Sequence, residues 1–382
     1  MRATLPLGDW RFEHSTEKGI SLRDPVNFLV SALKGQLANR KKQKNIATQT
    51  DMKGGSANGT CQNIQNRNLE EFSRAGVQPV SLSVYHSEEP KTGSDVILRR
   101  EGSEISAAIN LNWGYRYTVE TRDKIACYAY WLSRADSHVS ELLIDGSDGN
   151  FPTFSKFRFS AREDEMVLMP DAHFFRDHGY RETDQYAREH AVAWDDRSDQ
   201  IVWRGGPNGT GLFALGEDIV SEAGIIQRLR MAYACRPLGI DFRFVEDPTS
   251  NMLNPLAEAD LIGDFVPTND WGHMKYAIDI DGWTNAWSNL MQRLKLGCCV
   301  LKVQSPFGYR QWYYDSLIPW QHYVPVSADL TDLPERVDWV RSNREKARAI
   351  AAEGQELAMK MTFDSETAVA IDAINRHAEQ NQ

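Results

Sequence analysis

Residues 270–326 constrain the fold of this 382-residue chain more than any other segment. The segment contains an apolar strand, a glycine break, a tryptophan-rich helix, a second apolar strand, an aromatic stretch and a third strand. Strands that alternate with helical segments in this way predict a parallel α/β sheet. Because Trp, Tyr, Asn, Gln and His are interspersed among the apolar residues, we expect a cleft for a ligand that carries rings and hydroxyls.

The charge of the chain and the distribution of its apolar residues argue against several classes of protein. Lys and Arg number 43 and Asp and Glu number 53, so the formal net charge is 43 − 53 = −10. An acidic chain argues against a nucleic-acid partner, because such proteins present a basic face. The N-terminus lacks the apolar core of a secretory signal, and no run of 18 apolar residues occurs. The expectation is therefore a cytoplasmic protein.

Residues 25–44 have the spacing of a helix and end in four basic residues. One interpretation is a surface helix whose cations lie near its C-terminus, where the helix dipole favours them. The other is a weak peripheral contact with anionic lipid, at the inner membrane of a bacterium. A polar linker follows at residues 45–62.

A glycine-rich loop follows the apolar strand predicted at residues 200–204. The loop reads Gly205-Gly206-Pro207-Asn208-Gly209-Thr210-Gly211 and comes directly after Trp203 and Arg204. Glycines let backbone N–H groups approach a phosphate closely, and an arginine adds a bidentate contact. The spacing matches neither a Walker loop nor GxGxxG, so a simple surface turn stays an alternative.

Several carboxylates lie where strands are predicted to end. Asp279 and Asp281 form a D-x-D pair, which suits Mg²⁺ or Mn²⁺ on a diphosphate but also occurs by chance beside a turn at Gly282. Asp171 closes the apolar run 166–169, and Asp177 follows nearby. A carboxylate at such a strand end faces the crevice of an α/β sheet, where it can take a proton from a hydroxyl.

A series of short motifs then occurs in a recognisable order. They are Trp203-Arg204-Gly205, Lys275-Tyr276, Asp281-Gly282, Leu296-Gly297, Trp312-Tyr313-Tyr314, Leu317-Ile318-Pro319-Trp320, His322-Tyr323-Val324-Pro325-Val326 and Asp329-Leu330-Thr331-Asp332-Leu333. This order resembles glycosyltransferase family 90, which includes capsule and lipopolysaccharide sugar transferases and protein O-glucosyltransferases. The resemblance spans about residues 165–370, and the spelling of residues 287–294 and 305–314 resembles the bacterial branch.

The resemblance implies an α/β fold of the GT-B type, in which two Rossmann-like domains face a cleft. On that basis we expect an N-terminal helix and linker at 1–60 and an acceptor-side domain at 61–198. A UDP-sugar-binding domain follows at 199–340, and helices at 341–382 cross back to the first domain. The family inverts the anomeric carbon and needs no metal or other cofactor, which agrees with a structural D-x-D.

The resemblance also implies residue roles. Asp171 is expected to activate the acceptor hydroxyl, with Asp177 as the alternative. Arg204 is expected to contact the donor diphosphate. The remaining expected donor-side residues are Trp203, Gly205, Gly206, Lys275, Tyr276, Asp281 and Gly282. Ser288 stands where animal members have a second phosphate-binding Arg, and whether Arg293 replaces it is open. Independently of the resemblance, five aromatic residues are candidates to stack on sugar or uracil, and about half of them are expected to lie in the core instead: Trp283, Trp287, Tyr309, Trp312 and Tyr313.

The predicted activity is transfer of a hexose or pentose from a UDP-sugar to a hydroxyl on a glycan, in lipopolysaccharide or capsule assembly. Two alternatives stay open. One is a catalytically silent homologue that binds a nucleotide sugar or carbohydrate, which the Ser288 departure favours. The other is a metal-dependent transferase that uses Asp279 and Asp281.

Overall fold

The computed structural model describes residues 57–113, 124–245 and 253–380, all within one compact unit, Ser56–Gln382. The helix predicted at 25–44 and most of the linker lie outside the described residues. Residues 57–62 belong instead to helix α2 (Ala57–Arg74). No helix in the described part of the chain is long and apolar enough to cross a membrane.

The first sheet has six strands in the order β1-β3-β2-β4-β5-β6. Their bounds are β1 Ser81–His86, β2 Asp95–Glu101, β3 Glu104–Ile109, β4 Glu141–Asp145, β5 Phe157–Arg158 and β6 Val167–Leu168. β2 runs antiparallel to both of its neighbours, and the other pairs are parallel. A tight turn with Gly102 at φ +61° joins β2 to β3. This hairpin makes the sheet mixed, so the expected Rossmann-like first domain is wrong in its strand pairing.

The second sheet has five strands, all parallel, in the order β11-β10-β9-β7-β8. Their bounds are β7 Ser198–Gly205, β8 Asp241–Phe244, β9 Met274–Asp279, β10 Cys299–Val303 and β11 Val324–Val326. The chain goes from β7 outward to β8 and then returns to the other side of β7 to form β9. The carboxyl ends of β7 and β9 therefore flank the switch point where α/β sheets bind ligands.

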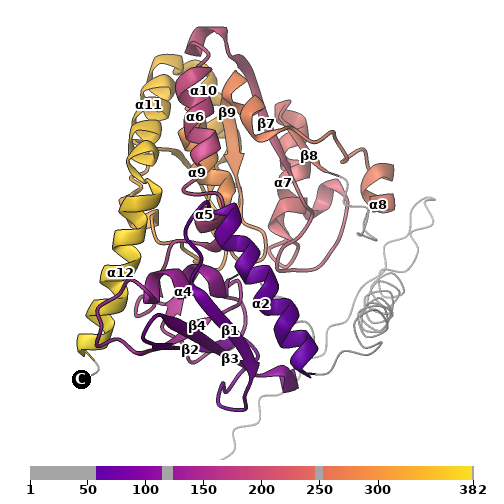
Figure 1. Ribbon diagram of the computed structural model, residues 1–382. Helices are drawn as coiled ribbons and strands as arrows, with labels where there is room; N and C mark the ends of the chain where they lie inside the picture. Colours follow the sequence, from indigo (N-terminus) through magenta and orange to yellow (C-terminus); the bar gives the residue numbers. More distant parts are fainter. Residues whose placement is uncertain (1–56, 114–123, 246–252, 381–382) are drawn as a thin grey trace, which may run out of the picture. The chain divides into compact units, whose positions relative to one another are not determined.

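Helices cover both faces of the second sheet (Figure 1). Alternate strand residues such as Ile201 and Trp203 share a core with α7 (Gln227–Cys235) and α10 (Leu333–Ser342). The intervening Val202 shares another core with α6 (Arg181–Glu189) and α9 (Ser288–Lys295). The two-residue period of a strand assigns neighbouring residues to opposite faces.

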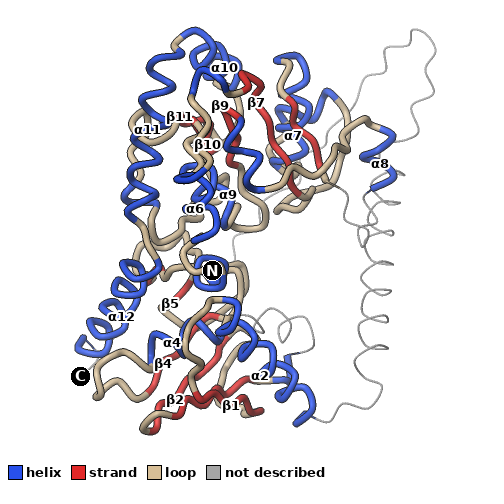
Figure 2. Tube along the Cα trace, turned by 45° about the horizontal axis from the view of Figure 1, so that its top comes forward, coloured by secondary structure: helices blue, strands red, loops and turns tan. Residues whose placement is uncertain are grey.

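Two helices follow the second sheet and pack differently. α11 (Arg344–Lys360) packs against α9 and β10. α12 (Phe363–Gln380) returns to the core of the first sheet, where it packs beside α4 (Ile125–Leu132) (Figures 1 and 2). Before α7, the chain forms a 3₁₀ turn at Glu217–Ser221 and a loop that contains Gly224.

Candidate active site

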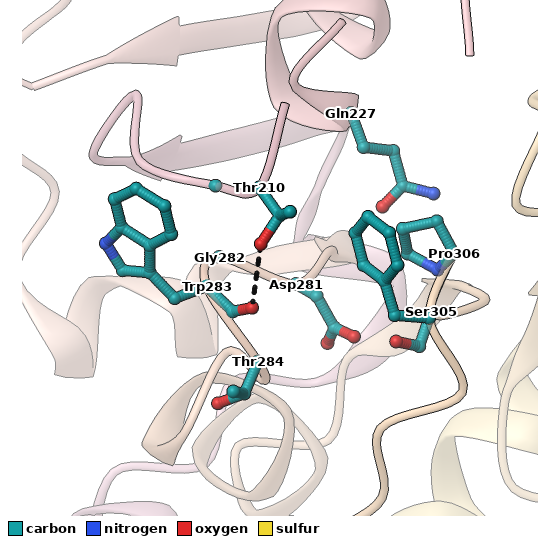
Figure 3. Close-up of a pocket in the computed structure, with 10 residues that line it drawn as sticks. Thr210, Gln227, Asp281, Gly282, Trp283, Thr284, Ser305 and Pro306 are labelled. Atoms are coloured by element: carbon teal, nitrogen blue, oxygen red, sulfur yellow. Dashed lines mark hydrogen bonds between the residues drawn. The ribbon is translucent and has the colours of Figure 1, made fainter. Parts of the chain in front are cut away.

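A small pocket lies at the switch point of the second sheet (Figure 3). The loops that follow β7, β9 and β10 form it, together with the first residue of α7. Its lining residues are Gly209, Thr210, Gln227, Asp281, Gly282, Trp283, Thr284, Ser305, Pro306 and Phe307. Because parallel strands point their carboxyl ends at one edge, loops far apart in sequence meet here.

The glycine-rich loop is held close to the segment that follows β9. The Thr210 hydroxyl donates to the Trp283 carbonyl over 3.4 Å. A Cβ on Gly209 would lie 2.8 Å from the Ile226 side chain, and Gly211 has φ +138°. Both positions therefore require glycine. The loop is a tightly packed wall of the pocket.

Arg228 is the cation beside this loop, and the sequence analysis missed it. Its Nη1 donates to the Gly206 carbonyl over 3.0 Å and to the Asn208 side chain, and its Nη2 donates to the Ile280 carbonyl over 3.0 Å. It is only 8% exposed, and burial lowers its pKa to about 10, so it stays charged at neutral pH. In the sequence, Arg228 could have been identified because it is the second residue of a helix that follows a glycine-rich loop, a position where proteins often bind anions.

The two carboxylates of the D-x-D pair have different environments. Asp279 is fully buried and accepts hydrogen bonds from Lys302 at 3.1 Å and from Asn289 at 2.8 Å. Both of its oxygens are thus used within the protein, which disfavours the interpretation that Asp279 and Asp281 hold a metal together. No group of three or more potential metal ligands occurs among the described residues.

Asp281 faces the pocket instead. Its carboxylate is 5% exposed and neither oxygen has a hydrogen-bond partner. The Ser305 hydroxyl points toward it without forming a hydrogen bond of normal geometry (Figure 3). Burial raises the pKa of Asp281 to about 6, against the opposing influence of Lys302, the Ser305 hydroxyl and Arg228.

Arg204 lies away from the pocket. Its guanidinium pairs with the Asp241 carboxylate at 2.6 Å and donates to the Asp264 carbonyl at 2.9 Å. Both partners lie toward β8. The neighbouring Trp203 stacks on Phe242 at 4.1 Å in the core. A Cβ on Gly205 would meet the Trp203 ring at 2.6 Å, so this glycine makes room for the indole. The structure therefore brings Arg228, and not Arg204, to the loop.

Lys275 and Tyr276 are also remote from the pocket. Both lie near the amino end of β9, whereas the pocket forms beyond its carboxyl end. Lys275 pairs with Asp199 at 2.8 Å, and the Tyr276 hydroxyl donates to the Val340 carbonyl at 3.1 Å. Lys275 and Tyr276 therefore hold β9 against neighbouring elements and do not contact the pocket.

The two residues considered for the second phosphate contact lie on α9. Ser288 begins this helix, and Arg293 lies under it with its guanidinium 3.9 Å from the Trp271 ring. Arg293 and Arg228 are similarly buried, but Arg293 packs against Trp271, which does not line the pocket, whereas Arg228 lies beside Gly282, which does. The structure does not place Arg293 where it would substitute for a second phosphate-binding arginine.

Asp171 has a structural environment. One carboxylate oxygen caps α5 (Ala172–Arg176) by accepting from the His173 and Phe174 amides at 2.8 and 2.9 Å. The other accepts from Gln311 at 2.9 Å. The residue is 1% exposed, and burial raises its pKa to about 6. Its proton-accepting positions are therefore used inside the protein.

Asp177 and Tyr313 are two more of the predicted residues. Asp177 pairs with Arg176 at 3.3 Å and lines a different depression, between α2, α6 and α9. Tyr313 is 2% exposed and belongs to the core. Trp283, by contrast, lines the switch-point pocket and is 45% exposed.

A carboxylate that the sequence analysis passed over lies at the carboxyl edge of the first sheet. Asp148 follows β4, is 32% exposed and pairs with Lys124 at the start of α4. Lys124 lies 5.9 Å from the Trp287 ring, and Trp287 directly precedes α9 in the second half of the chain. Asp148 is thus accessible and close to the segment that lines the pocket.

The sequence of the second half matches known proteins. Residues 259–367 match the model of glycosyl transferase family 90. Uncharacterized protein 179R of Invertebrate iridescent virus 6 is 31% identical over 183 residues, which cover 42% of this chain and 15% of the viral protein. Human protein O-glucosyltransferase 3 is 41% identical over 104 residues, which cover 27% of this chain and 19% of the human protein. The chain thus spans less than a fifth of either relative.

Solved structures show a more distant similarity. A glycosyltransferase from Rickettsia africae ESF-5 aligns over 85% of this chain and 83% of its own, with 12% identity and a TM-score of 0.38. The relatives named above are viral and human, so assignment to a bacterial branch stays a prediction.

Proposed function

Because residues 259–367 match the model of glycosyl transferase family 90, we propose that this protein transfers a sugar from a UDP-sugar to a hydroxyl acceptor. The observation that carries the proposal is the pocket at the switch point of the second sheet. The loops that follow β7, β9 and β10 line this pocket, and the buried Arg228 donates to the first of these loops. Two sheets and a returning α12 are consistent with a GT-B arrangement, although the first sheet is mixed.

We propose that Arg228 and the amides of the glycine-rich loop stabilise the diphosphate as it leaves. A buried guanidinium without a carboxylate partner is a preorganised positive charge. Such donors would act without a metal, and the engagement of Asp279 by Lys302 supports this. The acceptor oxygen attacks the anomeric carbon opposite the leaving UDP, so the configuration inverts and the bond to the diphosphate oxygen breaks.

For the general base we favour Asp148 over Asp171 and Asp177. A base must reach the acceptor hydroxyl, and Asp148 is more accessible than Asp171. Asp148 also pairs with the adjacent Lys124, which fixes its position near the pocket. Asp171 then positions α5 and Gln311 without touching the acceptor.

The proposal extends to the acceptor and to the cellular setting. The acceptor is a hydroxyl on a growing surface glycan, lipopolysaccharide or capsule, made on the cytoplasmic side of a membrane. The alternative of a catalytically silent homologue keeps its support from Ser288 and from the position of Arg293.

The test is UDP release from a panel of UDP-sugars, with and without a chelator, by wild type, Arg228→Ala and Arg204→Ala. We expect chelator-resistant release from one donor, reduced roughly 10²–10³-fold in Arg228→Ala. Arg204→Ala is the matched control, because it removes the same group on the β8 side and should keep the activity. UDP binding without release from any donor, even with acceptor glycans added, would favour the silent homologue. Absence of UDP binding would overturn the proposal.

A further inference from the structure

The switch-point pocket has an unusual excess of hydrogen-bond acceptors. Within the described chain, the buried side-chain atoms without a partner include both oxygens of Asp281, Oε1 of Gln227 and Oγ1 of Thr284. All three residues line this pocket and are at most 6% exposed. A buried polar group without a partner is costly, so a cluster of them indicates a ligand that supplies the missing partners.

The nature of these atoms defines the ligand group. The Asp281 carboxylate and Gln227 Oε1 only accept hydrogen bonds, whereas the Gln227 amide nitrogen already donates to the carbonyls of Gln304 and Ala328 at 3.1 and 2.9 Å. A phosphate offers no proton at neutral pH and would be repelled by Asp281. An ammonium ion is disfavoured, because the charges of Arg228 and Lys302 both act on Asp281. A neutral donor, the hydroxyl group, fits best.

The rim of the pocket adds a second requirement. Trp283 and Phe307 both line it and are 45% and 42% exposed, which is high for large aromatic side chains. Aromatic faces pack well against the C–H face of a sugar ring. Acceptors on the floor and aromatic rings at the rim together suit a polyhydroxylated ring.

We propose that Asp281, with Gln227 and Thr284, binds vicinal hydroxyls of a sugar ring in the nucleotide-sugar donor, while the diphosphate lies toward Arg228. This inference rests on the proposed function and assigns a substrate group to the pocket. The same chemistry is present in the ribose and in the transferred sugar, and the experiment separates the two.

The experiment is isothermal titration calorimetry with the full-length protein and four ligands: UDP, 2′,3′-dideoxy-UDP, UDP-glucose and UDP-xylose. If Asp281 binds the ribose, wild type should prefer UDP over the dideoxy analogue by roughly 10- to 100-fold, as for hydrogen bonds to a charged group. Asp281→Asn should lose most of that preference. If Asp281 binds the transferred sugar, both UDP ligands should bind alike, and the variant should lose the preference for one UDP-sugar over UDP.

Stability provides an independent readout and a control. Asp281→Asn has the same shape and removes an unpartnered buried charge, so the unliganded variant should melt at a higher temperature than wild type. Asp315→Asn removes the same charge from an 80% exposed side chain and should change neither binding nor melting.

Two results would overturn the inference. One is a wild type that binds UDP and UDP-sugars without distinguishing the hydroxyls, and the other is an Asp281→Asn variant that keeps the full preference. If the variant fails to fold, the comparison of the four ligands on wild type still tests whether the protein recognises these hydroxyls. A wild type that binds no nucleotide at all would overturn the proposed function and this inference with it.

Discussion

Replacement of Asp171 separates a structural role from a catalytic one. Its carboxylate caps α5 through the amides of His173 and Phe174 and also accepts from the buried Gln311 amide. Asp171→Ala removes all of these acceptors. Asp171→Asn keeps the capping oxygen and removes the charge, and the Gln311 amide can turn to present its oxygen.

The expected magnitudes follow from these contacts. Loss of an N-cap costs about 1 kcal/mol, and a buried amide left without an acceptor costs about 1–3 kcal/mol, so Asp171→Ala should lose about 2–4 kcal/mol. The rise of the Asp171 pKa from 3.8 to about 6 corresponds to about 3 kcal/mol. Because the fold disfavours the ionised form, this stability is present below pH 4 and is lost as pH rises through about 6. Above that pH, Asp171→Asn should be at least as stable as wild type.

The assays are urea unfolding at pH 7, followed by far-UV circular dichroism, and UDP release by the folded variants. We expect a lower urea midpoint for Asp171→Ala, an unchanged or higher one for Asp171→Asn, and near-normal activity in the latter. Asp148→Asn is the comparison and should lose roughly 10²–10⁴ in transfer rate with little effect on stability. A stable, inactive Asp171→Asn beside an active Asp148→Asn would refute this reasoning and restore Asp171 as the base.

Three further predictions concern charge and packing near the pocket. Asp281→Asn should become more stable relative to wild type as pH rises from 4 to 7, by up to about 3 kcal/mol. The reason is that only wild type ionises a carboxyl group whose pKa the fold raises to about 6. A difference in thermal melting that does not change with pH would contradict this prediction. Asp279→Ala should lose about 3–5 kcal/mol in urea unfolding, since it removes the carboxylate that pairs with the buried Lys302, and a loss below about 1 kcal/mol would show that the pair is unimportant. Gly205→Ala should lose about 1–3 kcal/mol, because its Cβ would lie 2.6 Å from the Trp203 ring, and unchanged melting would mean that the indole moves freely.

The strands of the second sheet were predictable because their pattern is local. The apolar segments and glycine breaks in residues 270–326 predicted β9, β10 and β11, and the turn expected at Gly282 follows β9 in the structure. The strands β2 and β5 of the first sheet are not apparent from the sequence. β5 has only two residues, and the pairing of β2 depends on partners distant in sequence.

The candidate site was predictable only in part. The sequence favoured Arg204 because it adjoins the glycine-rich loop, yet its guanidinium pairs with Asp241 on the neighbouring strand. Arg228 lies 24 positions further along and reaches the loop because α7 folds back over it. Adjacency in sequence does not determine direction in space, since successive strand residues point to opposite faces.

The sequence by itself determined the parallel α/β character of the second half and the glycines of its loop, because strand periodicity and backbone freedom are properties of short segments. Only the tertiary structure decided which carboxylates are available for a ligand. Asp279 and Asp281 are two residues apart, but Lys302 and Asn289 satisfy the first, whereas only the Ser305 hydroxyl points toward the second, without a hydrogen bond of normal geometry. That difference depends on neighbours from other strands and helices, and it is what assigns Asp281 to the pocket.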